Sequence, residues 1–443
     1  MAEIIPFKGI RYDPTKVDVE KVVAPPYDVI SDNHRDLLYQ RHPNNIVRLT
    51  RGKDLESDGP QENKYTRAAH SFREWTADGI LRQDERPSVY VYEQEYRFSS
   101  KKPIVRRGFI ALARLEEQES GVILGHEQTM MAPKHDRLNL MKECRANLSP
   151  IFSLFSEPEG SIDAILAKAA ASSPVFDLMD DKGVRNRLWV VSDPGMIESL
   201  CLEMWGRPLI IADGHHRYET ALIYRHIRRS EEESGSDAAP YNYIMMMFIN
   251  LDGEGVTIYP VHRIMHGIPD FDPSRFRKQL SEYFELTPYF FTCSNCEKAA
   301  EDLLKLMKLT GESAHAFGLY LGGEQFDLLT VKDSDRLAQL LDGVQCQSQR
   351  TLDVTIAQEV VLGHILGINA KNMEEEEHVR YTPESETAIE AVRRGEAQIA
   401  LLLNATKPEQ VKAVAREGGR MPQKSTFFYP KLLSGLVINR FDS

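Results

Sequence analysis

The stretch Ile210–Leu222 constrains the fold more than any other part of this chain. Its sequence, IIADGHHRYETAL, begins with apolar residues typical of a buried strand and reaches Asp213–Gly214 before a polar run. Glycine at position 214 permits a sharp turn, and the spacing predicts an amphipathic helix over Tyr218–Arg229. A strand that turns directly into a helix is typical of an α/β or α+β protein with mixed sheets. We therefore predict that fold class.

The same turn is suited to binding an anion. The first residues of a helix offer free N–H groups and the positive end of the helix dipole. We predict Asp213 and His216 as catalytic residues, Asp213 also as a metal ligand, and Gly214, His215, Arg217, Glu219 and Thr220 as ligand-binding residues. The structural alternative is that Asp213 caps the helix, Arg217 forms a salt bridge and one histidine is buried.

A second group of polar residues lies in Gly125–Ser149. We predict His126 as a ligand-binding residue, Glu127 as a general base, Lys134 and Arg137 as phosphate ligands, and Asp136 as a magnesium ligand. A helix is predicted to begin at Arg137, which would place Lys134 and Asp136 near its positive end. The alternative is a solvated turn and helix held by salt bridges.

A third group is the C-terminal stretch MPQKSTFFYPK at Met421–Lys431. A Walker A loop is excluded because the glycine spacing that precedes its Lys-Ser or Lys-Thr pair is missing. Lys424, Ser425 and Thr426 still offer a charge and two hydroxyls to a phosphate, so we predict them as ligand-binding residues. The alternative is a buried strand with a surface lysine. Asp28, which follows two prolines, is a further candidate carboxylate.

Several blocks of this sequence resemble one family, the bacterial and archaeal family catalogued as domain of unknown function 1015. The blocks are PPYDVIS, GHEQTMMAPKHDRLNLMKECRANLSPIF, IADGHHRYETA, IYPVHRI and MPQKSTFFYPKLLSGL. The DGHHR motif also resembles the corresponding motif of the ParB and sulfiredoxin superfamily, especially that of its free serine kinases. Asp213, Gly214, His216 and Arg217 match that motif, whereas His215 stands where those kinases have asparagine.

This resemblance implies a ParB/sulfiredoxin-like strand–DGHHR–helix core and a function. The implied function is nucleotide-dependent phosphoryl transfer involving a small hydroxylated metabolite, with free serine or phosphoserine as the first candidate and ATP or ADP and Mg²⁺ as cofactors. Such a reaction needs a base, for which Glu127 is preferred and Asp28 is the alternative. Two other functions stay open: a nucleotide-binding regulatory module of the ParB type without turnover, and a phosphoserine phosphatase.

Composition limits the remaining possibilities. The formal net charge of −12 argues against a general nucleic-acid partner, which would need a basic face. The N-terminus lacks the pattern of a signal peptide, no stretch is apolar enough for a membrane span, and five scattered cysteines fit a reducing compartment. We expect a soluble cytoplasmic protein with domains at 1–156, 157–267 and 268–443. The sequence does not determine the oligomeric state.

Overall fold

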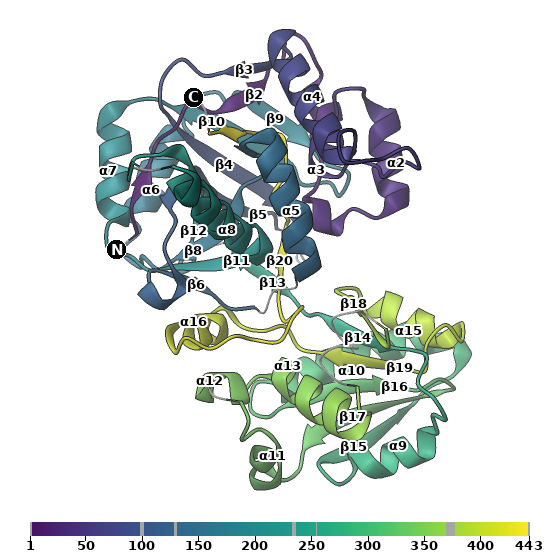
Figure 1. The fold of residues 1–443 in the computed structure, drawn as a ribbon. Coiled ribbons are helices and arrows are strands. Elements are labelled where there is room, and N and C mark those ends of the chain that lie inside the picture. The colour runs from purple at the N-terminus through teal and green to yellow at the C-terminus, as the bar shows by residue number, and fades with distance from the viewer. Residues whose placement is uncertain are drawn as a thin grey trace. The chain divides into compact units, whose positions relative to one another are not determined.

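The computed structural model describes residues 2–97, 102–127, 131–232, 236–253, 255–344, 346–368 and 377–441. Contacts within the chain separate it into two compact units. Unit 1 comprises Met1–Gly125, Thr129–Thr257 and Pro430–Ser443, and unit 2 comprises His126–Gln128 and Ile258–Tyr429. The C-terminal residues therefore return to the unit in which the chain begins (Figure 1).

Unit 1 is built on a nine-stranded mixed sheet in the order β6-β11-β8-β12-β5-β4-β10-β9, with β1 paired to β5. The strands are β1 Ile4–Ile5, β4 Val89–Tyr96, β5 Ile104–Arg114, β6 Ile123–Gly125, β8 Ile151–Phe155, β9 Phe176–Met179, β10 Arg185–Val191, β11 Leu209–Asp213 and β12 Tyr243–Asn250. The pairs β6–β11 and β8–β12 are parallel, and the other pairs are antiparallel. The mixed sheet confirms the predicted fold class.

Helices surround this sheet (Figure 1). They are α1 Val19–Val22, α2 Asp32–Arg41, α3 Val47–Thr50, α4 Lys64–Ala77, α5 Met131–Cys144, α6 Ser161–Ala169, α7 Pro194–Met204 and α8 His215–Glu231, with short 3-10 turns η1 Tyr27–Val29, η2 Gln118–Ser120 and η3 Pro240–Asn242. Two small pairs complete the unit, β2 Ile10–Tyr12 with β3 Leu81–Gln83 and β7 Ala146–Asn147 with β21 Asn439–Arg440.

The core of unit 1 follows from the alternation of side chains along the strands. On β4, Val89 and Val91 face the main apolar cluster, which also takes side chains from α5, α6, α7 and α8. Tyr90 and Tyr92 lie on the opposite face, as successive residues of a strand must. Helices α5, α6, α7 and α8 therefore cover one face of the sheet, and the buried Tyr90 and Tyr92 lie on the other.

Unit 2 contains a six-stranded antiparallel sheet in the order β15-β17-β16-β19-β14-β18. Its strands are β14 His262–Met265, β15 Phe284–Phe290, β16 Ala316–Tyr320, β17 Gln325–Val331, β18 Val379–Thr382 and β19 Ile399–Leu403, and β13 Thr257–Tyr259 pairs with β20 Phe427–Tyr429. Its helices are α9 Pro273–Leu280, α10 Cys296–Thr310, α11 Ser334–Leu340, α12 Gln347–Arg350, α13 Asp353–Ile356, α15 Ser385–Arg393 and α16 Pro408–Arg416, with the 3-10 turn η4 Cys293–Asn295 and the π-helix η5 Ala357–Ile365. Helices α10 and α15 pack their apolar side chains on one face of the sheet.

The two units differ from the predicted division at 1–156, 157–267 and 268–443. The expected boundary after residue 156 falls inside unit 1, because β8 pairs with β11 and with β12 in one sheet. The expected boundary after residue 267 lies close to the start of the long segment of unit 2 at Ile258. Pairing of β8 with strands distant in sequence therefore keeps the residues on both sides of position 156 in one unit.

The helix expected from Arg137 begins six residues earlier, at Met131, and ends at Cys144. A proline at position 133 is tolerated there because N–H groups in the first turn of a helix have no intrahelical partner. The helix stops because Arg145 adopts a positive φ of 46°. Among the residues that the structure describes, no helix has the length and apolar character that crossing a membrane requires.

Candidate functional site

The turn between β11 and α8 has the geometry that the sequence predicts. Strand β11 ends at Asp213, and α8 begins at His215. Gly214 between them adopts φ 101° and ψ 26°, a left-handed conformation that favours glycine. No side chain caps the helix through a hydrogen bond at this residue. The Gly214 turn therefore joins β11 directly to α8.

Arg217 folds back over this turn. A Cβ atom added to Gly214 would lie 3.0 Å from Nη2 and 3.1 Å from Cζ of Arg217. The guanidinium donates to the carbonyl of Pro150, to Oγ of Ser149 at 3.2 Å and to Oδ2 of Asp213 at 3.3 Å. Its side chain is 11% exposed. The salt bridge of the structural alternative is thus present, and it holds the guanidinium at the start of α8.

The Asp213 carboxylate also contacts a second cation, Lys431, which the sequence did not predict as a site residue. Nζ of Lys431 lies 3.2 Å from Oδ1 of Asp213, whereas Nη2 of Arg217 lies 3.3 Å from Oδ2. Lys431 belongs to the C-terminal segment of unit 1. The signal in the sequence is a single lysine between the apolar runs FFYP and LL, and the sequence predicts Lys424 of the same stretch as the ligand-binding lysine instead.

The other residues of the motif have different surroundings. His215 is buried, and a Cβ atom added to Gly125 would lie 3.4 Å from its Cδ2, so it packs against the end of β6. His216 is half-buried in the first turn of α8. Glu219 accepts a hydrogen bond of 3.0 Å from Nζ of Lys134, and the buried Thr220 has its hydroxyl 3.5 Å from the carbonyl of Lys134. These last contacts join α8 to α5.

Arg137 and Asp136 form a neighbouring cluster. The Arg137 guanidinium lies 3.9 Å from the centre of the Tyr27 ring and donates to the carbonyl of Thr50 at 2.7 Å and to Asp136 at 2.9 Å. Burial acts to raise the pKa of Asp136, but Arg137 and the hydroxyl of Tyr65 outweigh it and the pKa is lowered. The carboxylate therefore stays ionised as the partner of Arg137.

Tyr27 connects this cluster to the DGHHR turn. Burial and the adjacent Asp28 carboxylate raise the pKa of the Tyr27 phenol to about 12, whereas Arg137 and Arg217 act to lower it and Asp213 adds to the rise. The phenol thus lies within electrostatic range of all these charges. Asp28 itself is exposed in the turn η1. The PPYD block is thereby brought to the same part of unit 1 as Asp213.

Two cavities adjoin these residues. One of about 360 Å³ is lined by Tyr27, Arg35, Leu49, Thr50, Arg51, Gly52, Asp54, Lys64, Tyr65, Pro133, Asp136, Arg137 and Leu140. A smaller one of about 50 Å³ has Arg137, Ser149 and Arg217 among its lining residues. Arg137 lines both cavities. The structure therefore brings Arg137, Asp136 and Arg217 to one region, with Asp28 and Asp213 nearby.

Residues of unit 2 form a separate group. His126 is buried, with Nε2 3.3 Å from Oγ1 of Thr426, and that hydroxyl lies 3.3 Å from Oε1 of Glu127. Ser425 is buried and its hydroxyl donates to the carbonyl of Pro422 at 2.5 Å. Lys424 is exposed and adopts a positive φ of 55°. The prediction that this group shares a site with Asp213–Thr220 stays a prediction, because the two groups belong to different units.

The carboxylates expected to hold magnesium are occupied by cations. Asp213 contacts Lys431 and Arg217, and Asp136 contacts Arg137 and Lys64. Within the described ranges, no group of three or more His, Cys, Asp or Glu side chains is arranged to hold a metal. The donor set therefore fits magnesium in one mode alone, a single carboxylate that joins an ion already carried by phosphates.

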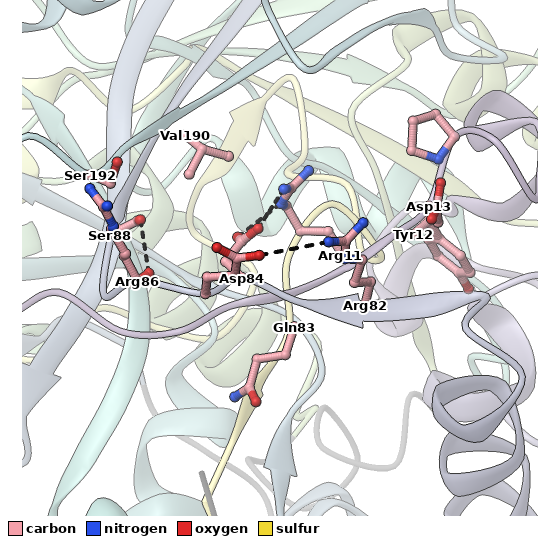
Figure 2. A pocket seen from close by; sticks show the side chains of 12 residues that line it. Arg11, Tyr12, Asp13, Arg82, Gln83, Asp84, Arg86, Ser88, Val190 and Ser192 are labelled. Atoms are coloured by element: carbon pink, nitrogen blue, oxygen red, sulfur yellow. Dashed lines mark hydrogen bonds and ion pairs between the residues drawn. The ribbon is translucent and has the colours of Figure 1, made fainter.

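A further cavity of about 440 Å³ lies beside β2 and β3, and none of the predicted site residues lines it (Figure 2). In it Arg11 binds Asp84 through two hydrogen bonds, of 3.0 and 2.5 Å. Asp84 also accepts from the hydroxyl of Tyr90 at 2.9 Å. These polar groups satisfy one another, so the cavity offers no spare charge of either sign from this pair.

The comparisons with known proteins bear on the family. A family model described as "Protein of unknown function (DUF1015)" matches residues 4–355. The chain belongs to the DUF1015 family. Among curated proteins, no sequence matches this DUF1015 chain.

Solved structures that resemble this DUF1015 protein do so distantly. A conserved hypothetical protein from Pyrococcus furiosus shares 14% identity at a TM-score of 0.37, covering 75% of this chain and 96% of that one. A free serine kinase in complex with AMP shares 13% identity at a TM-score of 0.36, covering 72% and 86%. A variant free serine kinase in complex with ADP shares 13% identity at a TM-score of 0.36, covering 75% and 90%.

Proposed function

We propose that this DUF1015 protein transfers a phosphoryl group between a nucleotide, ATP or ADP, and the hydroxyl of a small metabolite, with free serine as the first substrate to test. The observation that carries the proposal is the turn at Gly214. There the start of α8 and the Arg217 guanidinium come together at the end of a strand. Backbone N–H groups and an arginine at a helix N-terminus are the donors that a phosphate requires.

Each of these residues would have a distinct role in the reaction. Arg217 and the first turn of α8 would bind phosphate oxygens, and Arg137, stacked on Tyr27, would bind a second anionic group. Asp213 would be the protein ligand of a magnesium ion that arrives with the nucleotide. That ion shields the phosphate charge against the incoming hydroxyl. Most of the catalytic effect would come from positioning and charge neutralisation.

The transfer needs a base for the substrate hydroxyl. The hydroxyl oxygen forms a bond to the terminal phosphorus, the bond from that phosphorus to the bridging oxygen breaks, and the hydroxyl proton passes to a carboxylate. We place Asp28 first in this role, because Tyr27 beside it lies within electrostatic range of Arg217 and Asp213 in the same unit. Glu127, held by Thr426 in unit 2, is the alternative.

The direct test is an assay of product. Purified protein is incubated with ATP or ADP, serine and Mg²⁺, and phosphoserine is followed by ³¹P NMR. We expect phosphoserine to form with one nucleotide, and Asp28→Asn to lower kcat by about 10²–10⁴-fold because a positioned base contributes that much. Glu127→Gln is the matched comparison and is expected to retain activity.

Other outcomes of the same assay would replace the proposal. Release of inorganic phosphate from phosphoserine without nucleotide would identify a phosphatase. Tight nucleotide binding with no turnover of serine or related hydroxy acids would identify a regulatory module. Loss of activity in Glu127→Gln with Asp28→Asn unaffected would assign the base to Glu127.

A further inference from the structure

The C-terminal segment of unit 1 is attached to the body of the unit along its length. Ser434 exchanges backbone hydrogen bonds of 2.8 and 3.2 Å with Ala24, and Ile438 exchanges two of 2.9 Å with Ile10. This segment appears as the yellow strand that runs through unit 1 in Figure 1. Lys431 is the second residue of the segment. The main chain of Lys431 therefore belongs to a segment that backbone hydrogen bonds hold in place.

A buried row of polar side chains crosses the sheet beneath Lys431. Asn186 on β10 pairs in register with Gln94 on β4, and Gln94 pairs with Arg106 on β5. Directly paired residues of neighbouring strands point to the same face, so the three side chains form one row. Each is 1% exposed. We call Asn186, Gln94 and Arg106 the polar row.

The polar row binds the main chain at residues 430–431. Nε2 of Gln94 donates to the carbonyl of Lys431 at 3.0 Å and to Oδ1 of Asn186 at 3.1 Å. Arg106 donates to Oε1 of Gln94 and to the carbonyl of Pro430. Polar groups are costly to bury, and apolar side chains would complete a sheet at lower cost. The specific effect of the row is to hold Lys431 in one place.

The place where Lys431 is held is the DGHHR turn. Its Nζ lies 3.2 Å from Oδ1 of Asp213, while Nη2 of Arg217 lies 3.3 Å from Oδ2. Arg106 also lies over the ring of Phe152, 4.7 Å from its centre, and Phe152 pairs with Asp213 across β8 and β11. Lys431, Arg217 and Asp213 together carry one more positive charge than negative. This excess attracts an anion to the turn, in a protein whose net charge is −12.

We propose that Lys431 is a phosphate-binding residue of this site and that Gln94 is the positioning residue that holds it there. The ligand is a phosphorylated compound, either the nucleotide or the phosphorylated metabolite. Its phosphate oxygens would replace the Asp213 carboxylate as the partner of Lys431 and Arg217. The inference rests on the proposed function, since it names a further ligand contact at the same turn. It adds a residue that lies outside the DGHHR motif and comes from the opposite end of the chain.

Binding measurements with matched ligands test the role of Lys431. Isothermal titration compares ADP with adenosine, and phosphoserine with serine, for the full chain and for Lys431→Met. A charge-assisted contact predicts that Lys431→Met weakens binding of the phosphorylated ligand by about ten- to a hundredfold and leaves its unphosphorylated counterpart unchanged. A loss confined to ADP assigns the contact to the nucleotide, and a loss confined to phosphoserine assigns it to the metabolite.

Two variants control this experiment. Lys431→Arg keeps the charge and is expected to recover part of the affinity. Lys8→Met removes an exposed lysine from the same unit and is expected to change nothing. Affinities for both ADP and phosphoserine that are the same in Lys431→Met as in the wild type would overturn the inference and leave the proposed function standing. Failure of the wild type to bind either phosphorylated ligand would overturn both.

The role of Gln94 is tested by a double-mutant cycle. Gln94→Met is expected to lower the melting temperature, and also to weaken ADP binding while adenosine binding is kept. In the Lys431→Met background the same change is expected to cost no further ADP affinity, because Gln94 acts through Lys431. Equal and additive losses in both backgrounds, or a loss of stability with the affinities for ADP and phosphoserine both unchanged, would show that Gln94 is a structural residue alone.

Discussion

At the scale of single residues, Gly214 meets two requirements that no residue with a side chain could meet. Its φ of 101° lies where a Cβ atom is strained, and that atom would also lie 3.0 Å from the Arg217 guanidinium. The backbone conformation serves the turn, and the missing side chain leaves room for the cation. The turn conformation and the position of the Arg217 guanidinium therefore both depend on glycine at position 214.

Gly214→Ala is expected to lower the free energy of unfolding of unit 1 by about 1–3 kcal/mol, the cost of an L-residue in a sparsely populated conformation. It is also expected to weaken ADP binding, because it would displace the guanidinium that we propose as a hydrogen-bond donor to phosphate. Urea unfolding followed by tryptophan fluorescence measures the first effect, and titration with ADP measures the second. Unchanged values in both would show that the turn relaxes without consequence.

Arg217 is both a structural residue and a candidate ligand contact. It bridges α8 to Ser149 and Pro150, so Arg217→Ala is expected to lower the melting temperature as well as the affinity for ADP. Arg217→Lys keeps the charge but loses the planar fork, and is expected to recover less than half of the lost binding free energy. Adenosine binding is the control. A fall in the affinity for adenosine equal to that for ADP would contradict a phosphate contact.

At the scale of elements, α5 and α8 are joined by the pair of Lys134 and Glu219. Both side chains are largely buried, at 13% and 17% exposed, and Nζ lies 3.0 Å from Oε2. The sequence predicts both residues as ligand contacts. The structure instead shows them in contact with each other, and so offers a second role as the connection between two helices.

A double-mutant cycle on Lys134→Met and Glu219→Gln separates these roles. Each single change is expected to cost about 1.5–3 kcal/mol of stability, as for a hydrogen bond to a charged group. The double variant is expected to cost little more than either one, because the pair acts as a unit. Denaturant unfolding measures the loss of unfolding free energy in each variant. A fall in ADP affinity in Lys134→Met that Glu219→Gln does not share would restore the phosphate role of Lys134.

At the scale of the whole molecule, the two units contain different titratable groups. His262 in unit 2 is buried between β14 and β19, and its Nδ1 accepts from the N–H of Leu403 at 3.1 Å. Burial, with a smaller contribution from Arg263, lowers the pKa of this imidazole from 6.5 to about 3. The unfolded chain therefore binds a proton below pH 6.5 that the folded unit does not.

The linkage predicts that unit 2 loses stability as the pH falls from about 6.5 toward 3, and that this group has no effect above that range. Calorimetry between pH 7 and 4 is expected to show the shift. Tryptophan fluorescence is the internal control, because all three tryptophans, Trp75, Trp189 and Trp205, belong to unit 1. His262→Gln keeps an acceptor without a proton site and is expected to flatten the pH dependence. An equally steep acid effect in that variant would contradict the prediction.

Features that depend on neighbouring residues could be predicted from the sequence. The helix α7 matches its sequence pattern, because Asp193 accepts a hydrogen bond from the N–H of Met196 and a proline occupies the first turn. The Gly214 turn, the strand before it and the helix after it follow from the same short-range chemistry. Capping, turn conformation and side-chain alternation act over a few residues, and a single sequence contains all of that information.

Tertiary structure alone decided which distant residues meet. The sequence by itself determined the DGHHR turn, the mixed fold class and the family, but it did not single out Lys431 or Tyr27 as neighbours of the site. Their places beside Asp213 and Arg137 depend on strand pairing and on the return of the C-terminal segment to unit 1. The free energy of those contacts comes from packing and burial across the whole unit. No local pattern encodes such contacts, because they join residues far apart in the chain.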